Sequence, residues 1–132
     1  MDMESGLVRS IYYGRIGSSA TEKLLEKFGQ DGSFLLRDSE TVQGAYCLCV
    51  RKAPYVHTYR VERDKDGWYL QDLKGRLLRF ETLESLIQNY RRDRVSHFGI
   101  VPLTYPLDKT TVPSGWVQGP AYMELNGSES GQ

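Results

Sequence analysis

The sequence has no excess of charge of either sign, which limits the class of partner. Its 132 residues carry 17 Lys and Arg against 17 Asp and Glu, so the formal net charge is zero. A nucleic-acid-binding protein usually has a basic surplus or a long basic stripe, and this chain has neither. We therefore expect no nucleic-acid partner, and any anion must be recognised locally, by a few arginines.

Cysteine, histidine and long apolar runs are also scarce. Cys47 and Cys49 would share one face of a strand, with side chains poorly directed for a mutual disulfide. A metal site needs more ligands than these thiols, His57 and His97 supply, so we expect reduced, buried thiols and no metal or other cofactor. No segment approaches the ~18 apolar residues of a membrane span, so we expect no membrane insertion and a cytoplasmic setting.

Motifs of phosphate-processing enzymes are missing as well. A cysteine phosphatase needs C-x₅-R, but Ala53 and Tyr55 stand six places after the two cysteines. The phosphate-binding loop G-x₄-G-K-[ST] is absent, and no Ser-His-acid set suggests itself. We therefore expect no enzymatic activity.

The periodic segments predict two helices. The first starts at the capping-box pattern Ser19-Ala20-Thr21-Glu22 and stops at Gly29, with apolar residues spaced for one buried face. The second is capped by Thr82 and buries Leu83, Leu86, Ile87 and Tyr90.

Strands lie before and between these helices. A short one is expected at Ile11–Tyr13, and turn signals separate the others, which are Ser33–Asp38, Gly44–Arg51, Val56–Glu62, Trp68–Asp72, Leu77–Phe80 and Ile100–Val101. This order predicts an α+β fold, a central antiparallel β-sheet flanked by two α-helices. Residues 1–10 are expected to form a loose arm, residues 11–107 the domain, and residues 108–132 a flexible tail poor in core-forming residues.

One arginine ends an otherwise apolar strand. In Phe34-Leu35-Leu36-Arg37, strand alternation puts Leu35 and Arg37 on the same face, so the guanidinium follows an apolar neighbour inward. Burying it unpaired is costly, so an anion must meet it. Asp38 or Glu40 could form an internal ion pair with Arg37.

The other source of an anion is a ligand. Ser39 and Thr41 offer hydroxyl donors, and the loop ending at Gly44 offers backbone amides, a set that matches a phosphate monoester. Arg60 would either add a second positive group or remain an ordinary surface arginine.

From Ile11 to Pro106 these motifs resemble the Src-homology-2 (SH2) family. The segments that carry the resemblance are Tyr12-Tyr13-Gly14-Arg15-Ile16, Asp31–Glu40, Gly44–Val50 and Thr58-Tyr59-Arg60-Val61. Within the family, Ile11, Tyr46–Val50, Gly99–Leu103 and Tyr105-Pro106 resemble the SLAM-associated protein group of small free-standing SH2 adaptors, with the SH2 domains of inositol 5-phosphatases second.

The resemblance implies a phosphotyrosine site. Arg37 would make the bidentate phosphate contact, Ser39, Thr41 and the Glu40 backbone would be loop donors, and Arg60 would lie along the phosphotyrosine ring. Ser18 occupies a position where many members carry a basic residue that reaches the phosphate. Because a hydroxyl cannot replace that charge, phosphate affinity would depend more on Arg37 and Arg60.

The resemblance also implies a specificity groove and a set of partners. The groove positions match Thr58, Tyr59, Leu70, Tyr90 and Ile100, of which Leu70, Tyr90 and Ile100 read equally well as ordinary core. An apolar groove would favour an aliphatic residue about three places after the phosphotyrosine. The expected partners are tyrosine-phosphorylated receptor tails, including those of immune receptors.

Two further positions bear on how a signal would leave the molecule. Tyr122 in the tail is either an incidental tyrosine or a kinase substrate that recruits tyrosine kinases or other SH2 proteins. Glu81 stands where the best-known adaptor of the group recruits a Src-family kinase through an arginine, so that mode is not expected here. Met1 and the tail favour a whole small protein. The alternatives are an SH2 domain excised from a larger signalling enzyme, or a phosphoinositide-binding module.

Overall fold

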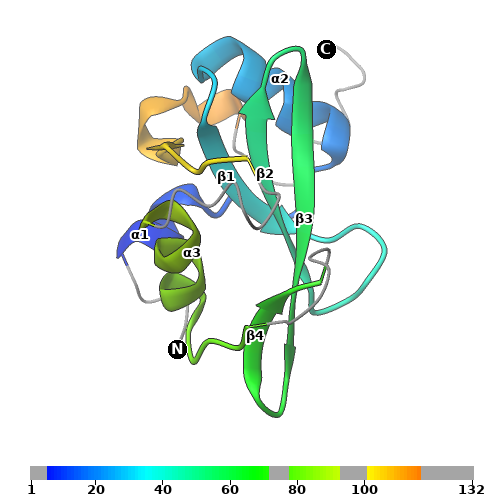
Figure 1. Ribbon diagram of the computed structural model, residues 1–132. Coiled ribbons are helices and arrows are strands. Elements are labelled where there is room, and N and C mark those ends of the chain that lie inside the picture. Colours follow the sequence, from blue (N-terminus) through cyan, green and yellow to red (C-terminus); the bar gives the residue numbers. More distant parts are fainter. Residues whose placement is uncertain (1–5, 72–77, 93–100, 117–132) are drawn as a thin grey trace.

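The computed structural model describes residues 6–71, 78–92 and 101–116. Among these residues a five-stranded, strongly curled sheet has the strand order β4-β3-β2-β1-β5 (Figure 1). Neighbouring strands are antiparallel, except that β5 runs parallel to β1. The strands are β1 (Ser33–Asp38), β2 (Tyr46–Lys52), β3 (Tyr55–Asp64), β4 (Gly67–Leu70) and β5 (Tyr105–Pro106).

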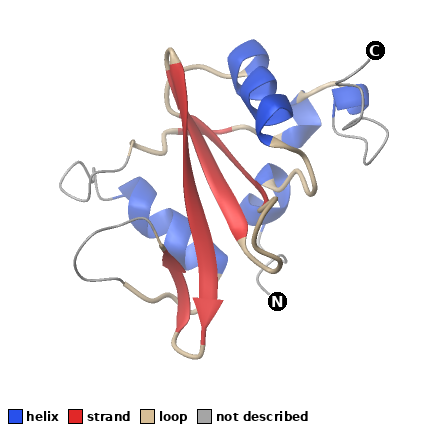
Figure 2. Cartoon of the chain, turned by 90° about the vertical axis from the view of Figure 1, so that its right-hand side faces the viewer, coloured by secondary structure: helices blue, strands red, loops and turns tan. Residues whose placement is uncertain are grey.

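Helices cover both faces of this sheet. Figure 2 shows α2 (Ser18–Phe28) and α3 (Leu83–Arg92) on opposite sides of it. The short helix α1 (Gly6–Ile11) packs beside α3. Two turns of 3₁₀ helix, η3 (Lys109–Thr111) and η4 (Ser114–Trp116), follow β5. The predicted α+β architecture, with a largely antiparallel sheet between two helices, is confirmed.

Strand β1 separates two hydrophobic clusters because its apolar run faces both ways. Phe34 and Leu36 point into the cluster beneath α1 and α3, whereas Leu35 points into the cluster beneath α2. All three are fully buried, as a central strand covered on both faces requires. Arg37 follows Leu35 by two residues and therefore lies on the α2 side.

The sequence predicted the start of α3 and the end of α2 correctly, but not the start of α2. The Thr82 cap is confirmed, since the Ser85 amide donates to Thr82 Oγ1 at 3.0 Å. The stop at Gly29 is also confirmed, because α2 ends at Phe28. The Ser19 capping box is wrong: α2 begins at Ser18, and its N-cap, Gly17, has no side chain to accept the first amides.

The N-terminal prediction needs correction. The chain is helical from Gly6, and Val8 and Ile11 are fully buried, so this part of the predicted arm belongs to the core. The strand predicted at Ile11–Tyr13 is reduced to one bridge between Tyr12 and Leu36. The spacing of three residues between the apolar Val8 and Ile11 is compatible with a helix, but this helix is too short for the pattern to be recognised in the sequence.

The C-terminal prediction also needs correction. Val101 is not in a strand and Ile100 lies outside the described residues, while the short strand after α3 is β5. Residues 108–116, predicted as flexible tail, pack on the body: Val112 is buried and the Trp116 ring meets Phe28 edge-on at 5.3 Å. Of the predicted strand Leu77–Phe80, Leu77 lies outside the described residues, and Phe80 forms an antiparallel bridge with Trp68.

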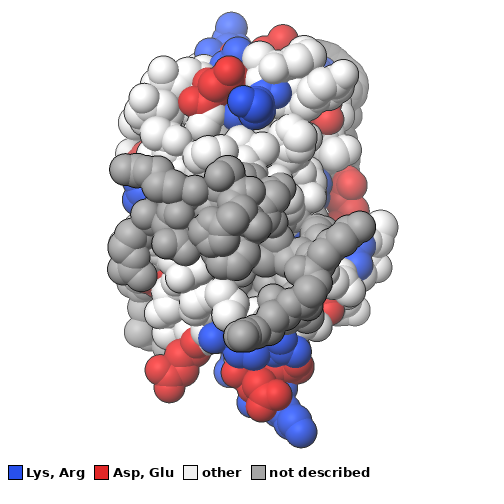
Figure 3. All heavy atoms as spheres, viewed as in Figure 1, with Lys and Arg blue, Asp and Glu red and all other residues white. Residues whose placement is uncertain are grey.

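Charges of both signs alternate at the end of the molecule formed by β3 and β4. Figure 3 shows acidic and basic side chains intermixed there, at the lower end of the view. Arg79 forms a bidentate pair with Asp64, with Nη2 2.6 Å from Oδ2 and Nε 3.1 Å from Oδ1. That pair lowers the pKa of Asp64 to about 2. In the part of the chain that is described, no helix is long and apolar enough to cross a lipid bilayer.

Candidate functional site

Arg37 is buried without a matching charge. The residue is 4% exposed, and its Nη1 donates to the Asp38 carbonyl oxygen at 3.1 Å. Its Nε is buried and has no hydrogen-bond partner among the described residues. A buried guanidinium in this state carries a desolvation penalty that a neutral carbonyl and the nearby Cys49 thiol only partly offset. The site is therefore incomplete and suited to an incoming anion.

Neither carboxylate that could have paired with Arg37 does so. Asp38 accepts a hydrogen bond from the Tyr12 hydroxyl, 2.6 Å from Oδ1. The Glu40 carboxylate lies beside the start of α2, where a Cβ placed on Gly17 would be 2.7 Å from Oε2. The positive end of the helix dipole favours a negative group there. Of the two sources of an anion for Arg37, the internal ion pair is thus not formed within the described residues.

The register of the sheet brings Arg60 to the same face as Arg37. Arg37 of β1 is opposite Cys47 of β2, and Cys47 is opposite Arg60 of β3. The Arg60 guanidinium is already engaged at the surface, with Nη1 3.0 Å from Gln71 Oε1 and 3.7 Å from Glu62 Oε2. To contact a ligand, Arg60 would exchange or share these partners.

The loop after β1 is folded around Ser39. Its Oγ accepts hydrogen bonds from the amides of Thr41 at 3.3 Å and Val42 at 3.1 Å. The Ser39 hydroxyl proton therefore remains as the group that it has to donate to a ligand. Gly44 closes the loop with φ +88°, a left-handed conformation that side chains rarely adopt.

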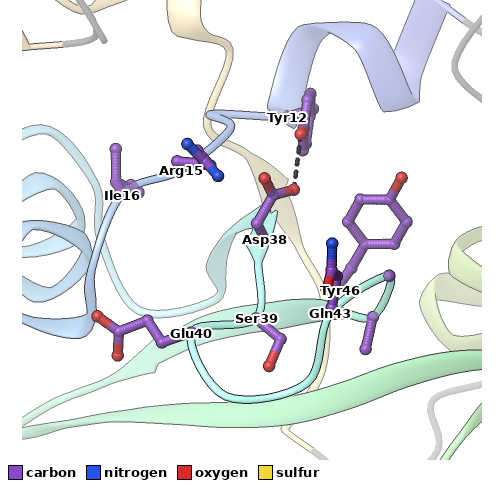
Figure 4. A pocket seen from close by; sticks show the side chains of 10 residues that line it. Tyr12, Arg15, Ile16, Asp38, Ser39, Glu40, Gln43 and Tyr46 are labelled. Carbon is purple, nitrogen blue, oxygen red and sulfur yellow. Dashed lines mark hydrogen bonds between the residues drawn. The ribbon is translucent and has the colours of Figure 1, made fainter. Parts of the chain in front are cut away.

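A cavity of about 710 Å³ lies between this loop and the segment before α2. Figure 4 shows Arg15, Asp38 and Glu40 around its hollow, with Tyr12 and Tyr46 on one side. Burial and the neighbouring Asp38 carboxylate raise the pKa of Tyr12 well above its usual value. Sequence reasoning gave roles to four of the lining residues, Asp38, Ser39, Glu40 and Gly44. The others are Tyr12, Arg15, Ile16, Gln43, Ala45 and Tyr46.

Ser18, predicted as part of the phosphate site, lies at the start of α2. It is the first residue of α2, is exposed, and follows Gly17, which faces Glu40 of the loop. Thr41 is exposed on the same loop. The structure thus brings the helix start and the loop together beside the strand that carries Arg37.

Of the predicted groove residues, Tyr59, Leu70 and Tyr90 belong to the cluster beneath α3, whereas Thr58 lies on the α2 side. The Thr58 hydroxyl donates to Cys49 Sγ at 3.7 Å on the α2 side, while the Tyr59 hydroxyl, on the other face, accepts from the Val101 amide at 3.1 Å. Leu70 and Tyr90 are each 1% exposed and pack in the cluster beneath α3. Ile100 lies outside the described residues, as does Tyr122.

Comparison with known proteins places these features in a family. The SH2 domain family matches residues 11–90. Human SH2 domain-containing protein 1B is 38% identical over 107 residues, which is 80% of each chain. Phosphatidylinositol 3,4,5-trisphosphate 5-phosphatase 2A of Danio rerio is 43% identical over 96 residues, 71% of this chain but 7% of the enzyme. The corresponding phosphatase 1 of Xenopus laevis is 45% identical over 101 residues, 74% of this chain and 10% of the enzyme. The phosphatases therefore match only through a small part of their length.

Proposed function

The chain belongs to the SH2 domain family, and from this premise we propose that it is a phosphotyrosine-reading adaptor of tyrosine-kinase signalling whose phosphate contact is Arg37. SH2 domains bind phosphotyrosine peptides, and the similarity to human SH2 domain-containing protein 1B over most of both chains supports an adaptor. The observation that carries the residue assignment is the buried Arg37 with a free Nε and no carboxylate partner in the described chain.

Arg37 is suited to a phosphate because its guanidinium presents two parallel donors. Such a group binds two oxygens of one phosphate with defined geometry, which a lysine cannot do. Ser39, Thr41 and the backbone of Glu40 would donate from the loop, and Arg60 would approach the tyrosine ring from β3. With Ser18 in place of a basic residue, the positive charge of this site would come from Arg37 and Arg60, together with Arg15 in the lining of the cavity.

The specificity that we propose is for an aliphatic residue about three places after the phosphotyrosine. An extended peptide crossing β3 presents alternate side chains to the domain. Thr58 and Tyr59 would contact the peptide as it crosses the strand. Leu70, Tyr90 and Ile100 would form the apolar wall, and Leu70 and Tyr90, each 1% exposed, would have to become accessible to a ligand.

The proposed partners are tyrosine-phosphorylated receptor tails in the cytoplasm, including immune receptors. The adaptor would block competing SH2 proteins at those tails, or recruit tyrosine kinases and other SH2 proteins through phosphorylated Tyr122. Docking of a kinase SH3 domain at the start of α3 is not part of the proposal. The reason is that Glu81 is exposed there and would repel the acidic surface that such domains present.

Calorimetric titration tests this function directly. The purified chain is titrated with a phosphotyrosine peptide carrying an aliphatic residue at the third following position, with its unphosphorylated twin, and with soluble phosphoinositides. We expect binding to the phosphopeptide alone, and near-complete loss of it in Arg37→Lys. The matched control is Arg51→Lys, because Arg51 also extends from a central strand but is bonded to the Gly29 carbonyl oxygen at 2.7 Å.

Three results would argue against the proposal. Equal binding of the unphosphorylated twin would remove phosphotyrosine as the determinant. Tighter binding of phosphoinositides than of any phosphopeptide would assign the pocket to lipid head groups. Unchanged affinity in Arg37→Lys would move the phosphate contact to other residues.

A further inference from the structure

The last described residues hold the chain on the α2 side of the sheet. Leu107 and Val112 are buried in the cluster beneath α2, and the Trp116 ring meets Phe28, the last residue of α2, edge-on at 5.3 Å. Figure 1 shows this segment, in orange, beside α2. Arg37 lies on the same side of the sheet as this segment. The chain that follows Trp116 therefore starts on the side where Arg37 would meet a phosphate.

A tyrosine in that following chain has the pattern proposed for a ligand of this domain. Tyr122 comes six residues after Trp116, and in the segment Tyr122–Leu125 leucine is the third residue after the tyrosine. An aliphatic residue at this spacing is what the apolar wall beneath α3 would accept from a peptide bound through Arg37. Phosphorylation would therefore turn Tyr122 into a ligand for the chain's own site.

We propose that phosphorylated Tyr122 binds in cis to the Arg37 site and keeps the domain closed to receptor peptides; this rests on the proposed function. The modification is a phosphoryl transfer from ATP, catalysed by a tyrosine kinase. The Tyr122 hydroxyl oxygen bonds to the γ-phosphorus, the bond from that phosphorus to the bridging oxygen breaks, ADP leaves, and the hydroxyl proton passes to solvent. The product carries about −1.5 to −2 charge units at neutral pH.

The chain between Trp116 and Tyr122 is long enough for this contact. Helix α2 has 11 residues and spans about 16 Å. Phe28, the neighbour of Trp116, is at one end of the helix, and Ser18 is at the other end, beside the loop after β1. Six residues span up to about 20 Å when extended, and the tyrosine side chain adds to that reach. Phosphorylated Tyr122 can therefore travel the length of α2 from its anchor to the phosphate site.

The direction of the chain also fits the site. Arg37 lies on the α2 side of the sheet, whereas Leu70 and Tyr90 of the proposed apolar wall lie in the cluster beneath α3. A peptide bound to both must keep the residues before its phosphotyrosine on the α2 side and lead the later residues towards α3. The tail starts on the α2 side, so it would reach Arg37 with Tyr122 first and direct Leu125 towards the wall.

Charge and tethering both favour the contact in cis. Arg37 has a buried Nε without a partner among the described residues, and Arg15 adds positive charge in the adjoining cavity. A ligand joined to its site by a short linker acts at an effective concentration on the order of millimolar. A receptor peptide at micromolar concentration then competes poorly, whereas a dense array of receptor phosphotyrosines displaces the tail. Displacement exposes phosphorylated Tyr122 to other SH2 proteins, which couples receptor binding to recruitment.

The experiment uses the full chain with phosphotyrosine incorporated at position 122 during synthesis. Treatment with a kinase is avoided because Tyr55 and Tyr105 are also exposed, by 67% and 46%. The modified and unmodified chains are titrated calorimetrically with a phosphotyrosine peptide that carries an aliphatic residue at the third following position. We expect the modified chain to bind this peptide roughly tenfold or more weakly, and to sediment as a monomer.

Two variants of the modified chain test the geometry. Removal of residues 117–119 places the phosphotyrosine three residues after Trp116, a span of only about 10 Å, so affinity for the peptide should return to that of the unmodified chain. Removal of residues 129–131 is the matched control and should leave affinity low, because it does not change this linker. In addition, a synthetic peptide of residues 117–128 with phosphorylated Tyr122 should bind the unmodified chain and fail to bind its Arg37→Lys variant.

The outcomes separate this inference from the function on which it rests. If the unmodified chain does not bind the receptor-type peptide, the proposed function itself is contradicted. With that binding intact, the inference is overturned if the tail phosphopeptide does not bind, if the modified chain binds as tightly as the unmodified one, or if the shortened linker does not restore affinity. Loss of affinity through concentration-dependent dimers also overturns it, because the tail of one copy would then fill the site of another.

Discussion

Replacing Arg37 with methionine should stabilise the unliganded protein while abolishing phosphopeptide binding. The buried guanidinium, whose Nε has no partner among the described residues, costs several kcal/mol of desolvation, and its bond to the Asp38 carbonyl oxygen returns about 1.5–3 kcal/mol. Methionine has a similar length and no charge to desolvate. We therefore expect Arg37→Met to raise the free energy of unfolding by roughly 1–3 kcal/mol, although most core substitutions lower it.

Urea unfolding with and without the phosphopeptide measures both effects. At about 100 times its Kd the peptide should stabilise the wild type by ~2.7 kcal/mol and leave Arg37→Met unchanged. Arg51→Met is the matched control. Arg51 bonds to the Gly29 and Leu25 carbonyl oxygens, so its removal should destabilise the fold by about 1–2 kcal/mol and preserve the response to peptide. A loss of more than ~1 kcal/mol in Arg37→Met would show that Arg37 is a satisfied structural residue and refute the reasoning.

Three further predictions test the start of α2, the β3–β4 turn and the charge pair beside it. Ser18→Arg should tighten binding of phosphorylated peptides only, by up to about 1.5–3 kcal/mol before solvent screening, and calorimetry with the unphosphorylated twin checks the restriction. Gly67→Ala should lower the free energy of unfolding by roughly 3 kcal/mol in urea, because φ is +128° and a Cβ would lie 2.5 Å from the Phe80 carbonyl oxygen; a loss under ~0.5 kcal/mol would contradict this. The Arg79 pair lowers the pKa of Asp64 from 3.8 to about 2, so its stabilisation is complete above pH 3.8 and is lost as pH falls towards 2. Acid unfolding of Asp64→Asn should therefore depend less on pH across that window than the wild type, and identical slopes would argue against the pair.

The sequence by itself determined the elements whose signals are local and strong. The predicted bounds of strand β1 agree with the structure at both ends. A short apolar run between turn residues is typical of a buried strand. The α3 start was located by Thr82, whose hydroxyl caps the helix in the structure. The importance of Arg37 also followed from sequence, since strand alternation alone sends its side chain inward after Leu35.

Only the tertiary structure decided what depends on contacts between distant segments. The first residues of α1 carry no strong helix signal, and they are helical because Val8 and Ile11 find a place beneath α3. Residues 108–116 lack core-forming composition, yet Val112 and Trp116 pack on the α2 side. Where the helix preference of a segment is weak, burial against distant residues determines its conformation. The spacing of apolar residues in the segment does not reveal that burial.

The candidate site likewise depends partly on local sequence and partly on tertiary structure. Sequence offered two sources of an anion for Arg37 and could not choose between them, because the choice depends on where two neighbouring carboxylates point. In the structure Asp38 is taken by the Tyr12 hydroxyl, and Glu40 turns to the start of α2. The register of three strands then places Cys47 between Arg37 and Arg60. The register between strands depends on residues far apart in the chain. The sequence could therefore identify these residues individually, but only the tertiary structure shows that they lie side by side.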